Sequence, residues 1–96
     1  FARAEQDLAD LTRALAVETG EFGVTANYIQ PGGIMTPESR DTFRKNEGLR
    51  DFCIRRSAAR RLGEPVDVAK VALFLASDVS AFVSGTGIRV DGGAIG

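Results

Sequence analysis

The 96-residue chain contains no histidine and no tryptophan, and Cys53 is its only cysteine. Without histidine, nucleophilic catalysis by a Ser-His or Cys-His pair and metal sites built on imidazole are excluded. One cysteine cannot form an intramolecular disulfide or a thiolate metal cluster, so we expect no metal site. The absence of disulfides fits a reducing compartment, and the cytoplasm is the expected location.

Long hydrophobic runs and a strong net charge are missing as well. No stretch approaches the roughly 18 apolar residues of a membrane span, and the opening FARAEQDLAD resembles no signal peptide. The formal net charge is −1, so we expect neither nucleic-acid binding nor attraction to an anionic membrane. With 44% hydrophobic residues, the chain is apolar enough to fold, although a chain this short has a thin core.

The spacing of apolar residues predicts alternating helices and strands. Residues 1–22 contain no proline and carry apolar side chains at helical spacing, which predicts an amphipathic helix ended by glycines. Residues 24–30 (VTANYIQ) predict a short strand, and residues 87–91 predict another. Residues 65–77 begin with proline and predict a largely apolar helix. Residues 31–63 predict a loop region with one or two short helices.

The predicted order is α-β-α-α-β, which is typical of an α/β fold with a parallel sheet buried on both faces. Two strands by themselves do not form such a sheet stably. We therefore expect residues 1–96 to form one partial domain. Its sheet would be completed by a missing N-terminal half or by a second copy of the chain.

Three segments resemble the short-chain dehydrogenase/reductase family in content, order and spacing. They are LTRALAVETGEFGVTANYIQPGGIMTP, RRLGEPVDVAKVALFLASD and FVSGTGIRVDGG, and they extend over about residues 8–93. The resemblance implies the C-terminal part of a Rossmann-like doubly wound parallel sheet. It also implies an oxidoreductase with an NAD or NADP cofactor that forms homo-oligomers, through the long first helix and the last helix-strand unit.

Residues Pro31 to Thr36 resemble the family's P-G-x-I-x-T loop, which closes over the nicotinamide end of the cofactor. The resemblance implies cofactor contacts for Pro31, Gly32, Ile34 and Thr36, with the Ile34 backbone at the carboxamide and the Thr36 hydroxyl at carboxamide or phosphate. A strand ending in Pro-Gly leaves backbone accessible to a flat ring, and a nearby hydroxyl adds a donor. Pro-Gly-Gly alone would favour an ordinary turn. The flanking segments in register favour the cofactor loop.

The region after this loop covers the substrate in the family. The resemblance implies that Phe43, Leu49, Phe52 and Ile54 form an apolar lining there. The composition of such a region varies with the substrate, and it identifies none.

The family's catalytic Tyr-x-x-x-Lys pair falls on different residues in this chain. Counting back from Thr12 by the family's spacing places Phe1 at the tyrosine position and Glu5 at the lysine position. In the family the tyrosine donates a proton to the developing alkoxide, while the lysine lowers the tyrosine pKa and contacts the ribose. Phenylalanine has no such proton, and glutamate has the opposite charge. No catalytic residue is therefore assigned.

The family's catalytic serine and its glycine-rich pyrophosphate turn would both precede residue 1. We therefore expect weak dinucleotide binding or none from this chain alone. Two other interpretations stay open. The chain could be a truncated, non-catalytic homo-oligomer that pairs through sheet edges and apolar helix faces. It could also carry an unrelated acquired activity, for which no group of residues points to a reaction.

Overall fold

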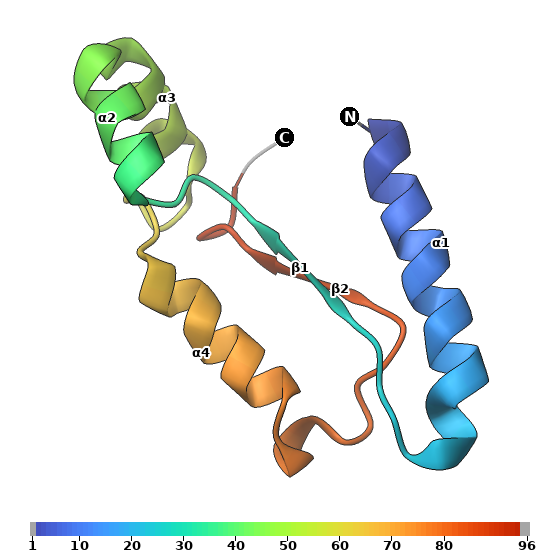
Figure 1. Cartoon of the computed structure of the whole chain (residues 1–96). Helices are drawn as coiled ribbons and strands as arrows, with labels where there is room; N and C mark the ends of the chain where they lie inside the picture. The colour runs from blue at the N-terminus through green and yellow to red at the C-terminus, as the bar shows by residue number, and fades with distance from the viewer. Residues whose placement is uncertain (1, 95–96) are drawn as a thin grey trace. The chain divides into compact units, whose positions relative to one another are not determined.

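The computed structural model describes residues 2–94 (Figure 1). Its helices and strands follow one another as α-β-α-α-α-β, with one helix more than the predicted order α-β-α-α-β, because the region of residues 31–63 contains two helices. The α/β class is confirmed. The helices are α1 (Ala2–Thr19), α2 (Pro37–Lys45), α3 (Glu47–Arg56) and α4 (Pro65–Leu75), the strands are β1 (Tyr28–Pro31) and β2 (Gly87–Val90), and the short 3-10 helices are η1 (Gly20–Phe22) and η2 (Asp78–Ser80).

Helix α1 is long because its sequence contains neither proline nor an interior glycine. On its surface the Gln6 side chain donates a hydrogen bond to Asp10 one turn later (3.0 Å). The helix tightens into η1 and then ends at Gly23, whose φ of 73° is a left-handed conformation that glycine adopts without strain. The Gly23 amide donates to the Gly20 carbonyl (3.0 Å) and closes the turn.

Strands β1 and β2 lie side by side and run parallel. The Tyr28 amide donates to the Thr86 carbonyl (3.1 Å), and the Gly32 amide donates to the Val90 carbonyl (3.0 Å). Both hydrogen bonds join residues with the same separation in sequence, as a parallel register requires. The sheet is a piece of the doubly wound arrangement that the sequence predicts.

The first strand begins at Tyr28, later than the apolar pattern of residues 24–30 predicts. The residues just before Tyr28 form hydrogen bonds with the turn that precedes β2 and not with the strand itself. The Asn27 side chain donates to the Val83 carbonyl (2.9 Å) and accepts from the Thr86 amide (3.2 Å). This asparagine thus fixes the point at which the two segments of the chain come together and the hydrogen bonds of the sheet begin.

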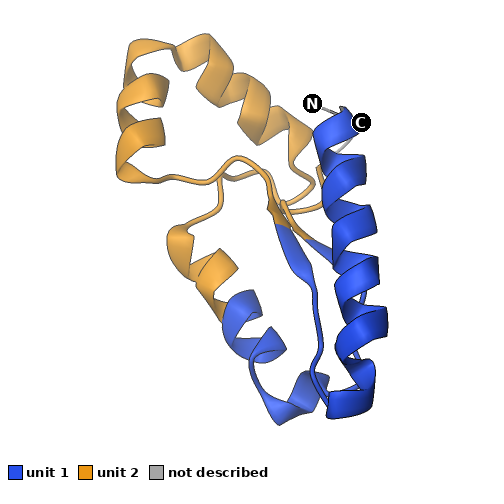
Figure 2. Cartoon of the chain, turned by 45° about the vertical axis from the view of Figure 1, so that its right-hand side comes forward, with its two compact units in different colours: residues 1–29, 71–88 blue, residues 30–70, 89–96 orange. Residues whose placement is uncertain are grey.

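The chain divides into two compact units (Figure 2). The first contains the segment that ends at Ile29 together with Val71–Ile88, and the second contains Gln30–Lys70 together with the segment that begins at Arg89. Each strand contributes residues to both units. The single-domain description of residues 1–96 stays a prediction.

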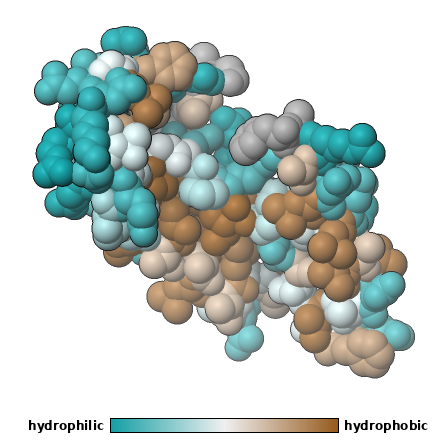
Figure 3. Space-filling view, turned by 45° about the horizontal axis from the view of Figure 1, so that its top comes forward, coloured by the Kyte–Doolittle hydropathy of each residue, from teal (hydrophilic) through white to brown (hydrophobic). Residues whose placement is uncertain are grey.

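Few hydrophobic side chains are buried within residues 3–94. The buried ones are Phe43 (7% exposed) and Leu62 (9% exposed), both in the second unit. Large apolar side chains are exposed on α1, on α4 and after η2, where Phe82 is fully exposed. Figure 3 shows hydrophobic side chains open to solvent on one face. A chain that buries so little apolar surface gains little stability from its own core.

Candidate functional site

The predicted cofactor loop lies at the carboxyl end of β1, within the second unit. Gly32 passes close to the chain that leaves β2: a Cβ at this position would lie 2.6 Å from Asp91 Cβ and 2.9 Å from Asp91 Cα. Side-chain atoms do not approach backbone so closely, so only glycine fits here. The expected reason for this glycine was access to a flat ring, whereas packing against Asp91 is sufficient to require it.

A second glycine holds the loop from the other side. The Gly63 amide donates to the Gly33 carbonyl (2.8 Å), and the Met35 amide donates to the Gly63 carbonyl (2.8 Å), so that Ile34 and Gly63 form a parallel bridge. A Cβ on Gly63 would lie 2.6 Å from Ile34 Cδ1. Gly63 belongs to the RRLGEP segment, which the sequence indicates only as a family motif, and in the structure this residue supports the loop directly.

The amide of Ile34 is the first available donor of this loop. Because the peptide group is planar and trans, the Ile34 N–H points opposite to the Gly33 carbonyl, which faces Gly63. Within residues 2–94 the Ile34 amide makes no hydrogen bond. Ile34 is a half-buried residue, and most buried backbone amides are paired, so an amide without a partner on this fixed loop is suited to a ligand acceptor.

The hydroxyl of Thr36 is the second available donor. Thr36 is the N-cap of α2, and Pro37 follows it at the first helical position. The Thr36 hydroxyl oxygen accepts a hydrogen bond from the Ser39 amide (3.1 Å), and the Thr36 amide donates to the Ser39 hydroxyl (2.7 Å). The oxygen of Thr36 is thus an acceptor for the helix, while its hydrogen is donated to the Ser39 hydroxyl (3.1 Å) and can turn from there to a ligand.

Ser39 was not singled out from the sequence. Its hydroxyl also donates to the Ile34 carbonyl (2.5 Å), so this one side chain contacts both ends of the Ile34 to Thr36 segment. The signal was present in the sequence as a hydroxyl residue three positions after Thr36, with proline directly behind the cap, which is the spacing of a capping box.

A cavity of about 280 Å³ lies beside the loop in the second unit. Its wall includes Ile34, Gly63, and two pairs of opposite charge. Arg61 lies 3.0 Å from Asp67, which also accepts from the Glu64 amide (2.7 Å). The hydrogen bond from Arg61, followed by that from the amide, holds the pKa of Asp67 below its ordinary value, and Asp67 in turn raises the pKa of Arg61.

The second charge pair follows β2. Arg89 lies 2.8 Å from Asp91, and the Gly93 amide donates to the same carboxylate (3.0 Å). Burial would raise the pKa of Asp91, but the hydrogen bonds from Arg89 and from the amides outweigh it, and the pKa is lowered. Each arginine in the cavity wall is balanced by an aspartate, so the cavity has no excess positive charge for an anion.

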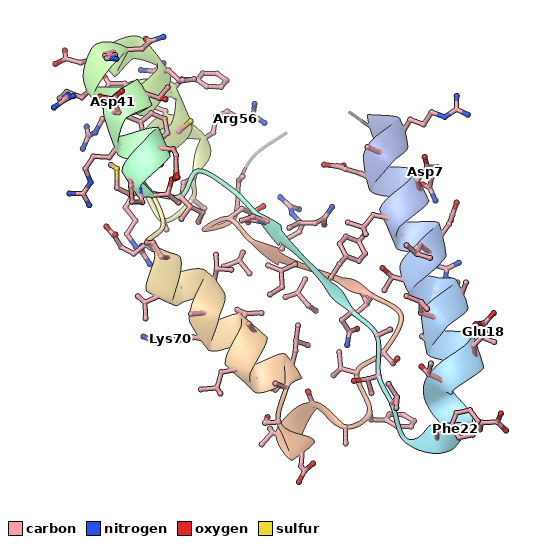
Figure 4. The ribbon with its side chains drawn as sticks, viewed as in Figure 1. Asp7, Glu18, Phe22, Asp41, Arg56 and Lys70 are labelled. Carbon is pink, nitrogen blue, oxygen red and sulfur yellow. The ribbon has the colours of Figure 1, made fainter. Side chains whose placement is uncertain are left out.

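Helices α2 and α3 form the region that the family resemblance predicts to cover a substrate. Of the predicted apolar lining, Phe43 is buried, Ile54 is half-buried, and Leu49 and Phe52 are exposed. Arg56, labelled at the end of α3 in Figure 4, lies over the Phe52 ring with its guanidinium carbon 5.2 Å from the ring centre. Phe43 therefore belongs to the core of these two helices, while Leu49 and Phe52 present apolar surface.

Of the two positions of the family's catalytic pair, Glu5 lies within the described residues. Phe1 lies outside the described residues. Glu5 is exposed in the first turn of α1, on the same helix as the acidic side chains of Asp7 and Glu18 (Figure 4). The assignment of these two positions rests on sequence register.

Among the residues that the structure describes, no three side chains of His, Cys, Asp or Glu gather as metal ligands. Over the same part of the chain, every helix is too short or too polar to cross a membrane.

Comparison with known proteins identifies the family. The sequence model described as enoyl-(acyl carrier protein) reductase matches residues 2–94. The chain belongs to the short-chain dehydrogenase/reductase family. An uncharacterized oxidoreductase of Schizosaccharomyces pombe is 38% identical over 95 residues, which are 99% of this chain and 37% of that protein.

Two solved structures show the same arrangement with a cofactor bound. A crystal structure from Agrobacterium tumefaciens, named for a 2-deoxy-d-gluconate 3-dehydrogenase, contains NADP and matches 95% of this chain and 37% of its own at 34% identity, with a TM-score of 0.86. A 4-hydroxyisoleucine dehydrogenase complexed with NADH matches 95% of this chain and 37% of its own at 28% identity, with a TM-score of 0.84. The chain thus spans less than two fifths of the length of these relatives.

Proposed function

We propose that this chain is the C-terminal portion of an NAD(P)-dependent oxidoreductase and that its Pro31 to Thr36 loop faces the nicotinamide end of the cofactor. The observation that carries the proposal is the pair of available donors on one fixed loop, the Ile34 amide and the Thr36 hydroxyl. A carboxamide offers a carbonyl oxygen to such donors. Pro31 and Gly32 shape the loop and place it at the carboxyl end of β1, where ligands bind in open α/β sheets.

The donor set fits a nicotinamide but supplies no anchor for the rest of a dinucleotide. NAD or NADP would provide the hydride chemistry, and in this chain Ile34 and Thr36 would orient its carboxamide. No charged residue lies on the loop from Pro31 to Thr36, and the arginines of the neighbouring cavity are paired with aspartates. We therefore propose weak binding through one end of the cofactor.

Hydride transfer by these 96 residues alone is not part of the proposal. Phe1 and Glu5 stand where the family has its proton donor and the lysine that activates it, and neither residue can perform those roles. The residues that complete the chemistry would have to come from another segment or another chain. A single cysteine agrees with a cytoplasmic location.

A second candidate is a non-catalytic homo-oligomer, and the exposed apolar side chains favour it. Leu11 and Val17 on α1, Leu73 on α4 and Phe82 are each more than half exposed. Apolar surface of this kind is typical of subunit interfaces, and the family's interfaces lie on these elements. Self-association and cofactor contact do not exclude each other, so both are tested on one sample.

The test is saturation-transfer NMR on the 96-residue chain with NADH and NADPH at about millimolar concentration, together with light scattering. Signal transfer to the nicotinamide protons, with little transfer to the adenine protons, is expected. The two cofactors should behave alike, because the phosphate that distinguishes them lies at the far end of the molecule. No transfer to the nicotinamide protons from a folded sample would refute the cofactor role. A monomeric mass would refute the homo-oligomer.

A further inference from the structure

We propose that Ser39 is a positioning residue of the cofactor-facing loop, holding Ile34 and Thr36 so that their donors face one ligand. The inference rests on the proposed function. It starts from three of the hydrogen bonds that join Ser39 to the loop. The Ser39 hydroxyl donates to the Ile34 carbonyl (2.5 Å) and accepts from the Thr36 amide (2.7 Å), and the Ser39 amide donates to the Thr36 hydroxyl (3.1 Å).

The hydroxyl of Ser39 is fully used by these contacts. It has two lone pairs and one hydrogen, which goes to the Ile34 carbonyl (2.5 Å) because the other acceptor in range, the Thr36 carbonyl, is farther away (3.3 Å). One lone pair accepts the Thr36 amide, and the Thr36 hydroxyl lies within hydrogen-bonding range of the other (3.1 Å). In the absence of a ligand the Thr36 hydroxyl therefore donates its hydrogen to Ser39. The hydroxyl can rotate to donate to a ligand without breaking the cap of α2.

The same contacts fix the orientation of the peptide groups. The peptide between Ile34 and Met35 is held at both ends, because its carbonyl accepts from Ser39 and its amide donates to Gly63 (2.8 Å). The preceding peptide is held by Gly63 through the Gly33 carbonyl (2.8 Å). Since peptide groups are planar, the direction of the Ile34 N–H is set by these neighbours. Gly63 and Ser39 thus act on the loop from opposite ends.

A capping role by itself would stabilise α2 but would not require a bond to Ile34. The hydroxyl of Thr42 in the same helix supplies the comparison: it is exposed and donates only to the Glu38 carbonyl one turn earlier (3.2 Å). Ser39→Ala and Thr42→Ala each remove one hydroxyl from α2. Only the first removes a contact to the loop, and Ser39→Thr keeps the hydroxyl.

The experiment measures two quantities on the wild-type chain and these three variants. The first is the hydrogen-exchange rate of the Thr36 amide by NMR. The second is the dissociation constant for NADH from an NMR titration, with ADP-ribose, which lacks the nicotinamide, as the negative control. Ser39→Ala should speed Thr36 exchange, because the Thr36 amide then keeps only its bond to the Ile34 carbonyl (3.1 Å). It should also raise the dissociation constant for NADH about fivefold, which corresponds to about 1 kcal/mol. Thr42→Ala should change neither, and Ser39→Thr should restore both.

Different outcomes refute different statements. Unchanged Thr36 exchange in Ser39→Ala, or equal effects of Ser39→Ala and Thr42→Ala, would overturn the role of Ser39. A faster exchange with an unchanged dissociation constant for NADH would reduce Ser39 to a helix cap and would also overturn the inference. If the wild-type chain binds ADP-ribose and NADH equally, the nicotinamide-facing function itself fails, and the exchange rates still decide whether Ser39 holds the loop.

Discussion

This chain needs glycine for two different reasons, a close approach of another segment and a left-handed backbone conformation. Three glycine-to-alanine substitutions separate them. At Gly32 an added Cβ would meet Asp91 Cα at 2.9 Å, at Gly23 the space is open but φ is 73°, and at Gly20 the space is open and φ is not positive. The chemical change is the same at all three positions. Any difference in the free energy of unfolding therefore reports local geometry.

The expected magnitudes follow from these geometries. Gly32→Ala forces two backbones apart, and overpacking of this kind costs about 2 kcal/mol. Gly23→Ala places a side chain in the left-handed region, which costs about 1 kcal/mol. Gly20→Ala meets nothing and reduces the freedom of the unfolded chain, so it should stabilise by about 0.5 kcal/mol. For a chain of this length, 1 kcal/mol shifts the midpoint of thermal unfolding by about 4–8 °C.

The assay is urea unfolding followed by circular dichroism at one protein concentration for the wild type and all three variants. The predicted order of stability is Gly20→Ala, wild type, Gly23→Ala, Gly32→Ala. If Gly32→Ala is as stable as Gly20→Ala, the close approach of Gly32 to Asp91 does not exist in solution. The reasoning that assigns this glycine to packing would then be wrong.

Two further predictions concern the charge pairs and the core. The lowered pKa of Asp67 and of Asp91 contributes stability that is present above their unfolded value of about 4 and is lost as the pH falls through the lowered folded values. The free energy of unfolding in urea should therefore fall below about pH 4, and it should fall less in Asp67→Asn. Between about pH 5 and 8 it should stay level because the chain has no histidine. Phe43→Ala should lower the free energy of unfolding by about 3 kcal/mol. In monomeric samples the fully exposed control Phe82→Ala should change it by less than about 0.5 kcal/mol. Equal losses in the two phenylalanine variants would contradict the observed core.

The sequence alone determined the elements and the family. Helix α1 follows from a run without proline or interior glycine, and its end follows from Gly20 and Gly23, because these signals act within a few residues. The loop after β1 was identified from Pro31, Gly32 and the motif around them. The departures at Phe1 and Glu5 also came from the sequence, since they depend only on counting from Thr12.

The tertiary structure alone decided which distant residues support the loop. Asp91 follows a different strand from Gly32, and Gly63 precedes a different helix from Ile34, so no local period connects either pair. The pairing of Arg61 with Asp67 and the double use of Ser39 likewise depend on how the backbone bends around them. Periodicity reports which side of an element a residue occupies, whereas these contacts depend on where separate segments meet in three dimensions.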